Sequence, residues 1–571
     1  MARTAADLLW AALRAEGAEF VFGLPGSQTI ETFQPLKRSG LRTVVPTHEM
    51  AAAFMAGGYA RVSGRPGVVT TIPGPGFTYA LTGLAEAFLD SVPLLHVVPA
   101  ARQIEGREFA LQAIDQPAMA GAVVKRLLRA ASPSDVPVTA VEAYRLAMAG
   151  EPGPVMVEAA EEGFGKEVER PRPIPALPVP PEVPDALAAD IAAAIASAPR
   201  VLLYLGAGAM AAGRELHALA HATGAAIATT TSGRGVFNED DPRVVVRDPG
   251  MQDHAVLAAL VEHADLVVAI GCKFSHNGAA GFRLRLPREK LVTINAAGPS
   301  KNYPARLHAT ADAGRTIAGV LARLPARPAG VAGWEAAMLA DWRESASRFE
   351  ADARLEPRHE MTGASSSAIV RELRQALPDD AIIVTDSGYH QMSVRRHYRV
   401  RRPHGLLVPT NFQSMGYAIP SAIGAALAAP SRRVVAVIGD GGMLMSGLEL
   451  ATAVRESVSL TVVVFNDGAY RLIRNPQLAA YGESHGTDIA GPELESLAAA
   501  TGADYRRVDA GGIEAALNAD RNDDSPVRLV EVPLVDSAGM KSVRRRGKLR
   551  AAAHRLLPAR GRSLLRRLFR R

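Results

Sequence analysis

The chain has 571 residues, which predicts three to four domains at roughly 150 residues each. Apolar residues make up 48% and charged residues 21%, which excludes a disordered or fibrous chain. The net charge is +6, but residues 541–571 hold 13 Lys or Arg and no Asp or Glu. Subtracting those 13 charges leaves −7 for residues 1–540. An acidic body argues against a nucleic-acid-binding protein, which would need a basic surface.

Three features of the sequence bear on the cellular compartment of the protein. The single cysteine, Cys272, excludes an internal disulfide and fits a reducing environment. No uninterrupted apolar run reaches 18 residues, so a transmembrane helix is not expected. The N-terminus carries Asp7 and lacks the apolar core of a signal peptide. The sequence therefore predicts a cytoplasmic protein.

Two breaks divide the chain into three blocks. Seven prolines between positions 167 and 185 predict an extended spacer, because proline fits neither a helix interior nor a central strand. A second break begins at Pro325 and includes a polar, helical stretch. The expected organisation is a first domain at 1–165, a proline-rich linker at 166–185, a central domain at 186–325, a linker with a helix at 326–359, a third domain at 360–540 and a basic tail at 541–571.

Each block alternates short apolar runs with helical patterns. Residues 201–205, 266–270 and 434–438 are examples of the runs. Short strands that are apolar throughout are buried on both faces, as in parallel sheets covered by helices. The sequence therefore predicts an α/β protein with three tandem, doubly wound parallel-sheet domains. In such sheets, ligands bind at the carboxyl ends of the strands.

Two aspartates in the third block each follow an expected strand. Asp440 lies in a Gly-Asp-Gly-Gly run after residues 434–438, and Asp467 follows residues 460–465. If the two strands are neighbours, both carboxylates project from one edge of the sheet. Carboxylate oxygens beside glycines that let a phosphate approach suit Mg²⁺. The alternative is that both acids only begin loops and cap helices.

An acid in the first block stands at the start of an Ala- and Gly-rich helix. Glu49 follows the expected strand 43–46, and the helix after it is apolar all round, so we expect it to be buried. A buried carboxylate needs a partner or a shifted pKa. A carboxylate at a helix N-terminus can also be a plain cap, so both interpretations stay open for Glu49 alone.

Together, these features resemble the thiamine-diphosphate enzymes of the acetolactate synthase and 2-oxoacid decarboxylase superfamily, over roughly residues 1–535. The likeness rests on Glu49, on Gly439-Asp440-Gly441 and on the Asn466-Asp467 pair. It extends to further motifs at 21–27, 74–76, 84–94, 111–116, 151–155, 386–392 and 415–425. The resemblance implies a pyrimidine-binding, a central and a diphosphate-binding domain, in that order.

The resemblance also implies a role for each matching residue. Glu49 would hydrogen-bond the cofactor's pyrimidine, and Gln112 would lie on the substrate side; both are the expected catalytic residues. Asp440, Asp467 and the backbone carbonyl of Ala469 would bind Mg²⁺. The expected cofactor-binding residues are Gly26, Gly74, Gly388, Tyr389, His390, Gln413, Met415, Gly439, Gly441, Gly442 and Tyr470.

The implied reaction is decarboxylation of a 2-oxoacid with transfer of the acyl carbanion to a second carbonyl, as in acetolactate synthase. Gln112 and the run at 111–116 favour this carboligase over a simple decarboxylase that releases an aldehyde. A non-catalytic paralogue is the rival outside enzymes, but Glu49 and Asp440 are both present. In the family the site lies between two chains, so a homodimer is the smallest expected unit and a homotetramer is favoured.

Several positions depart from the family. The runs at 248–253 and 272–277, and Asn295 after an expected strand, do not match the flavin motifs, so FAD is not expected. Asp467 stands where most relatives have Asn. Pro476 replaces a Trp, and Phe77 replaces a smaller residue and is expected to reshape the donor pocket. Arg471 and Arg474 are either ligands for an acidic substrate group or solvated surface charges.

The basic tail allows two interpretations. Leu564, Leu565, Leu568 and Phe569 fall on one helical face among arginines, a pattern typical of weak contact with an anionic membrane surface. A solvated tail, or a helix that closes over the site, is the favoured interpretation.

Overall fold

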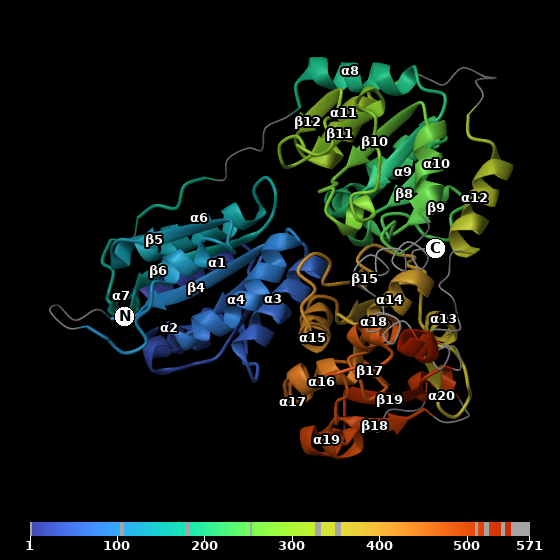
Figure 1. Ribbon diagram of the computed structural model, residues 1–571. Coiled ribbons are helices and arrows are strands. Elements are labelled where there is room, and N and C mark those ends of the chain that lie inside the picture. Colours follow the sequence, from blue (N-terminus) through green and yellow to red (C-terminus); the bar gives the residue numbers. More distant parts are fainter. Residues whose placement is uncertain are drawn as a thin grey trace, which may run out of the picture.

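The computed structural model describes residues 3–102, 108–170, 172–176, 183–251, 254–325, 333–348, 356–508, 512–518, 525–537 and 543–549. Three parallel sheets follow one another along the chain, each with helices on both faces (Figure 1). The predicted α/β class with three tandem doubly wound domains is confirmed.

The N-terminal domain contains a six-stranded parallel sheet. Its strands, in spatial order, are β2 (Arg42–Val44), β1 (Phe20–Gly23), β3 (Gly67–Thr70), β4 (Leu94–Ala100), β6 (Pro154–Ala160) and β5 (Arg126–Ala130). Its helices are α1 (Ala5–Ala15), α2 (Ile30–Ser39), α3 (Glu49–Ser63), α4 (Pro75–Leu89), α5 (Gln116–Ala120), α6 (Val136–Met148) and α7 (Glu161–Phe164). Buried side chains of α1 and α6 cover one face of the sheet, and those of α3 and α4 cover the other.

The central domain has the same construction. Its strands, in spatial order, are β12 (Leu307–Thr310), β11 (Leu291–Asn295), β10 (Leu266–Ile270), β7 (Val201–Leu205), β8 (Ala226–Thr229) and β9 (Val244–Arg247). Its helices are α8 (Asp185–Ala196), α9 (Gly213–Thr223), α10 (His254–His263), α11 (Ala313–Leu321) and α12 (Ala336–Arg348). The expected strands 201–205 and 266–270 are observed over those residues, because fully apolar runs are buried on both faces.

The C-terminal domain contains a seven-stranded sheet. Its main path is β13 (Arg358–His359), β19 (Val527–Val535), β17 (Leu460–Asn466), β16 (Val434–Gly439), β14 (Ile382–Thr385) and β15 (Leu406–Leu407), and β18 (Asp504–Arg507) pairs with β19. Among the strand pairs that the structure describes in this sheet, only the pair of the short β13 with β19 is antiparallel. The helices are α13 (Ser366–Ala376), α14 (Tyr389–His397), α15 (Ala418–Ala428), α16 (Asp440–Ser446), α17 (Glu449–Arg455), α18 (Arg471–Tyr481), α19 (Leu494–Thr501) and α20 (Gly512–Asn518).

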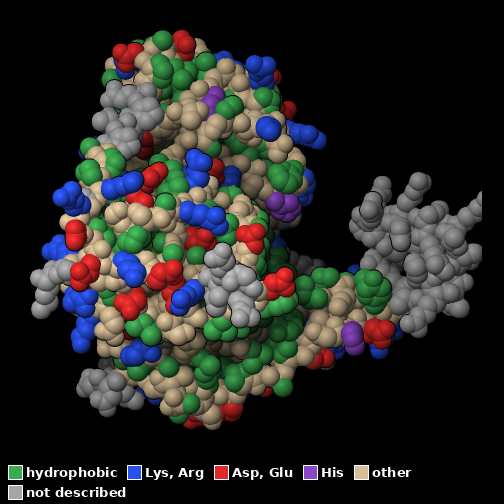
Figure 2. All heavy atoms as spheres, turned by 90° about the vertical axis from the view of Figure 1, so that its left-hand side faces the viewer, with side chains coloured by type: hydrophobic (Ala, Val, Ile, Leu, Met, Phe, Trp, Pro, Cys, Tyr) green, Lys and Arg blue, Asp and Glu red, His purple; other side chains and the backbone are tan. Residues whose placement is uncertain are grey.

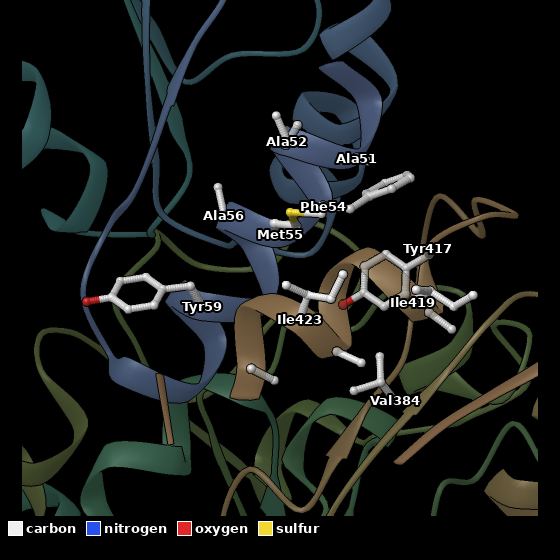
Figure 3. Close-up of a cluster of buried hydrophobic side chains, with 14 of the residues drawn as sticks. Ala51, Ala52, Phe54, Met55, Ala56, Tyr59, Val384, Tyr417, Ile419 and Ile423 are labelled. Atoms are coloured by element: carbon white, nitrogen blue, oxygen red, sulfur yellow. The ribbon is translucent and has the colours of Figure 1, made fainter. Parts of the chain in front are cut away.

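Helices α3 and α15 join the N- and C-terminal domains into one hydrophobic core (Figure 3). Their backbones cross so closely that a Cβ on Gly58 would lie 2.0 Å from the carbonyl oxygen of Ser421. A Cβ on Gly424 would lie 1.9 Å from the carbonyl oxygen of Met55. Only glycine fits at either position. The Gly content of both helices therefore sets the distance between the two domains.

The segments between and after the domains are described in part. Pro171 and residues 177–182 of the expected linker, and 326–332 and 349–355 of the second break, lie outside the described residues. Residues 543–549 form a helix whose Gly547 packs on the end of α18, where a Cβ would lie 2.0 Å from the Leu478 carbonyl oxygen. Residues 550–571, which include the expected amphipathic segment, lie outside the described part of the chain.

The face shown in Figure 2 carries positive and negative side chains interspersed, without a continuous basic stripe among its described residues. None of the described helices is both long and apolar enough to span a bilayer.

Candidate active site

Asp440 and Asp467 lie at the carboxyl ends of two neighbouring strands. β16 and β17 pair in parallel, with Gly439 opposite Phe465. Asp440 begins α16 directly after β16, and Asp467 follows the last residue of β17. The arrangement expected from the sequence, with both carboxylates at one edge of the sheet, is present.

Backbone amides hold the Asp440 carboxylate. The N–H groups of Gly441 and Gly468 donate to its two oxygens at 2.8 and 2.6 Å. Burial and the neighbouring Asp467 carboxylate raise the pKa of Asp440 to about 6 in the absence of a cation. Burial also raises the pKa of Asp467. Two buried carboxylates that disfavour each other's charge are suited to share a divalent cation.

A cavity of about 400 Å³ opens in front of this pair. Ten of the predicted residues of the C-terminal domain line it together with both aspartates: Gly388, Tyr389, His390, Gln413, Met415, Gly439, Gly441, Gly442, Ala469 and Tyr470. Four residues that sequence reasoning did not single out, Met445, Leu472, Ile473 and Leu534, give the cavity an apolar side. The cavity therefore joins a polar, glycine-rich end to an apolar end.

His390 lies on the glycine-rich side of this cavity. Its Nε2 is buried and has no hydrogen-bond partner among the described residues. Burial lowers the pKa of His390 to about 4, so its imidazole is neutral near pH 7. A Cβ on Gly388, whose φ is +153°, would lie 2.6 Å from the His390 ring, and a Cβ on Gly439 would lie 3.1 Å from it. These glycines leave a cradle in which a ligand oxygen could meet the unpartnered nitrogen.

Met415 projects into the cavity from the turn before α15. The carboxylate of the buried Asp386 accepts hydrogen bonds from the backbone N–H groups of Gly416 and Tyr417, at 2.9 and 3.0 Å. A Cβ on Gly442 would lie 2.1 Å from an oxygen of Asp386, so glycine is required there. Asp386 stood in a sequence motif, but the sequence assigned it no role. The structure shows that it anchors the Met415 turn.

The predicted residues of the N-terminal domain form a second group. Glu49 is the first residue of α3, and His48 caps the helix by accepting the Met50 N–H. Residues 51–60 are buried as expected, whereas Glu49 itself is half-buried. A Cβ on Gly76 would lie 3.0 Å from Oε1 of Glu49. Glu49 therefore stands at the carboxyl edge of the sheet, next to the Gly74–Gly76 turn.

Gln112 lies on the other side of that turn, in a left-handed conformation with φ of +60°. A Cβ on Gly74 would lie 2.6 Å from the Gln112 carbonyl oxygen. Oε1 of Gln112 is buried and has no hydrogen-bond partner in the part of the chain that the structure describes. Gly26 packs close to Ile72, which follows β3. Glu49, Gln112 and Gly26 do not line the cavity of the C-terminal domain.

The segments that carry the two groups of predicted residues touch where α3 and α15 begin. A Cβ on Gly416, the residue after Met415, would lie 3.6 Å from Cε of Met50. The Ser414 N–H donates to the buried Glu86 of α4 at 3.0 Å. Within one chain, the helix that starts with Glu49 thus contacts the turn that carries Met415.

Two expectations about the substrate side change. Arg471 is only 3% exposed and is not a solvated surface charge; its Nε and Nη1 pair with Asp467 and Asp536 at 2.5 and 2.6 Å. Phe77 is fully buried and stacks on His96, with ring centroids 6.1 Å apart, so it does not line the cavity. Pro476 lies inside α18, near Arg474.

A separate cleft of about 350 Å³ lies at the carboxyl ends of the central strands. Residues 272–275 and 295–298, which depart from the flavin motifs, line it. Asp248 does not line this cleft. Both of its carboxylate oxygens accept hydrogen bonds from Arg395. Gln252 and Asp253 lie outside the described residues.

Comparison with known proteins assigns the family. The Thiamine pyrophosphate enzyme models match in three parts: the N-terminal TPP binding domain at 3–119, the central domain at 188–320 and the C-terminal TPP binding domain at 386–532. A probable 2-ketoarginine decarboxylase of Pseudomonas aeruginosa is 33% identical over 523 residues, covering 88% of this chain and 89% of that protein. A probable chloroplastic acetolactate synthase of Oryza sativa is 32% identical over 477 residues, and the match covers 81% of this chain and 71% of that protein. A probable acetolactate synthase large subunit of Methanocaldococcus jannaschii is 28% identical over 523 residues, and the match covers 88% of this chain and 87% of that protein. The chain belongs to the thiamine pyrophosphate enzymes and resembles their acetolactate synthases and 2-oxoacid decarboxylases.

Proposed function

We propose that this protein uses thiamine diphosphate and Mg²⁺ to decarboxylate a 2-oxoacid and to transfer the acyl carbanion to a second carbonyl compound. The observation that carries this proposal is the pair of buried carboxylates, Asp440 and Asp467, at the mouth of a glycine-rich cavity with an apolar end.

The residues at the polar end fit a magnesium diphosphate. Asp440, Asp467 and the Ala469 carbonyl would supply three oxygen ligands, and Mg²⁺ commonly takes its remaining ligands from phosphate and water. Among the described residues, no group of three or more His, Cys, Asp or Glu is arranged to hold a metal ion. The unpartnered Nε2 of His390 would donate to a phosphate oxygen.

The remaining residues orient the substrate and move a proton. Bound thiamine diphosphate supplies a nucleophilic carbon and takes up the electron pair left when CO₂ departs. Glu49 would hold a proton at the cofactor's pyrimidine, and Met415, which lines the cavity, would contact the bound cofactor. The unpartnered, buried Oε1 of Gln112 would accept a hydrogen bond from the bound ligand. The apolar side chains Leu472, Ile473 and Leu534 would exclude water from the reacting carbon.

A simple decarboxylase is the second candidate, supported by the relative named a probable 2-ketoarginine decarboxylase. It would differ only in the last step, where the carbanion takes a proton and an aldehyde leaves. The side chains at the apolar end of the cavity would then decide which 2-oxoacid is the substrate.

We further propose a homodimer as the smallest active unit, and a homotetramer as the assembled form. Leu444 and Met445 of α16, and Leu448 directly before α17, are 48–63% exposed beside the cavity, and a second copy of the chain would cover them. Light scattering tests this directly. Leu448→Glu should weaken the dimer, whereas Phe282→Glu, at a 51% exposed site in the central domain, should not. An unchanged dimer in Leu448→Glu would contradict the assignment of this face.

The deciding experiment follows purified protein by NMR with thiamine diphosphate, Mg²⁺ and either pyruvate or 2-ketoarginine. Acetolactate from pyruvate would support the carboligase. Acetaldehyde, or the aldehyde of 2-ketoarginine, would support the decarboxylase. Glu49→Gln is the matched control, because it removes only the proton-holding oxygen. If a panel of 2-oxoacids is left unconsumed by the wild-type protein, both functions are contradicted.

A further inference from the structure

The side chain of Arg471 lies between two carboxylates at the edge of the C-terminal sheet. Arg471 begins α18, four residues after Asp467. Its Nε donates to Oδ2 of Asp467 at 2.5 Å, and its Nη1 donates to Oδ1 of Asp536 at 2.6 Å. Asp536 directly follows β19, which neighbours β17. One guanidinium therefore bridges the ends of two adjacent strands.

This bridge controls the orientation of Asp467. The other oxygen of Asp467 accepts the Ala469 N–H at 3.2 Å, so each oxygen has one partner. The donors of a guanidinium are fixed in a rigid fork, so the contact of Nη1 with Asp536 fixes the direction from which Nε meets Asp467. Arg471 is 3% exposed, and the Asp467 side chain is 8% exposed. Water therefore competes little for this contact.

The negative charge of the buried Asp467 carboxylate needs a positive charge nearby to compensate it. An asparagine would offer a neutral oxygen to the metal, whereas Asp467 adds a second negative charge beside Asp440 and beside the place of a diphosphate. Burial raises the pKa of Asp467 while Arg471 lowers it, so the two effects oppose each other. In a site with little water, an uncompensated carboxylate would repel a diphosphate.

We propose that Arg471, anchored by Asp536, is a positioning residue that orients Asp467 and offsets its charge, so that Mg²⁺ and a diphosphate bind together. This inference rests on the magnesium assignment in the proposed function. Arg471 acts through Asp467, because its Nε and Nη1 donors bind Asp467 and Asp536.

Arg474 provides a matched comparison. It lies one turn further along α18, and its nitrogens approach Asp488 at 3.7 Å and Asp536 at 4.0 Å. Both distances are longer than those of Arg471, and neither partner is an expected metal ligand. Substituting Arg474 therefore removes a positive charge from the same helix without touching Asp467.

The test measures thiamine-diphosphate affinity at saturating Mg²⁺ by calorimetry on cofactor-free protein, without substrate. Arg471→Met should weaken binding ten-fold or more, and Arg474→Met less than three-fold. Asp467→Asn should stay within about three-fold of wild type. The double variant Asp467→Asn/Arg471→Met should recover to within three-fold of Asp467→Asn, because the Asp467 charge that Arg471 offsets is then gone. The melting temperature of the cofactor-free variants reports any purely structural effect.

Wild-type affinity in Arg471→Met would overturn the inference. A double variant as weak as Arg471→Met would also overturn it, because Arg471 would then act independently of Asp467. If Arg471→Met does not fold, Asp536→Asn replaces it: binding should weaken, and Asp467→Asn should relieve the loss. Failure of the wild-type protein to bind thiamine diphosphate with Mg²⁺ would contradict the proposed function instead.

Discussion

The carboxylate of Asp386 accepts a 2.9 Å hydrogen bond from the backbone N–H of Gly416. It also accepts the N–H groups of Tyr417 and of its neighbour Ser387, both at 3.0 Å. The turn that carries Met415 is thereby tied to the end of β14. One fully buried acid thus sets the floor of the cavity.

The titration of Asp386 should appear in the pH dependence of stability. Burial raises its pKa to about 7, although three backbone donors oppose the shift. The folded protein then binds this proton more tightly than the unfolded chain, whose carboxyl has a pKa near 4. The stabilisation is therefore fully present below about pH 4 and is lost as the pH rises through 7.

Urea unfolding of the cofactor-free protein between pH 5 and pH 8 measures this effect. The Asp386→Asn variant lacks the titrating group, so its free energy of unfolding should fall less steeply with pH than that of wild type. Glu86, whose pKa burial also raises to about 7, is present in both proteins. Equal slopes in the two proteins would contradict the prediction.

Glu49→Gln should separate binding from chemistry. The variant keeps the shape of the side chain but cannot hold a proton in the same way, so we expect activity to fall about 100-fold or more. Thiamine-diphosphate affinity should change only a few-fold. Exchange of the cofactor's C2 proton in D₂O, followed by NMR, measures the proton step. Equal losses of binding and exchange would make Glu49 a structural residue.

Asp440→Ala should weaken cofactor binding more than turnover at saturation. Removing the carboxylate removes an expected Mg²⁺ ligand and leaves the Gly468 N–H without its acceptor. We expect the apparent affinity for thiamine diphosphate to drop about ten-fold or more at fixed Mg²⁺. Asp488→Ala is the control, because that side chain is 77% exposed. Unchanged affinity in Asp440→Ala would rule out the metal assignment.

Asp248→Ala should destabilise the contact between the central and C-terminal domains. Asp248 is fully buried and binds Arg395 through two hydrogen bonds of 2.7 and 2.8 Å. Without it, a buried guanidinium is left uncompensated, which typically costs about 3–5 kcal/mol. Removing Asp265 from its half-exposed pair with Arg200 should cost about 0–1 kcal/mol. Similar urea-unfolding midpoints for Asp248→Ala and wild type would refute this.

Purified protein should lack flavin. Residues that depart from the flavin motifs line the central cleft, and Asp248 is held by Arg395. We therefore expect no absorbance near 450 nm and no effect of added FAD on melting temperature. A stoichiometric flavin spectrum would contradict the prediction.

The sequence alone determined the three parallel sheets and the place of the two neighbouring carboxylates, Asp440 and Asp467. Runs such as Val434–Gly439 are apolar at nearly every position, and this pattern specifies a strand covered on both faces. Asp440 and Asp467 could be placed because each follows its strand immediately and the strands are neighbours. The resemblance then supplied the expected roles of the remaining residues.

Only the tertiary structure decided which side chains meet between distant segments. The sequence left Arg471 as either a substrate ligand or a surface charge, because its partner Asp536 is 65 residues away on another strand. Phe77 follows a glycine motif, yet it packs into the core on His96. The contact of α3 with α15 depends on two helix surfaces that fit only through Gly58 and Gly424. Local patterns encode strands and turns, whereas such contacts arise from packing across the whole chain.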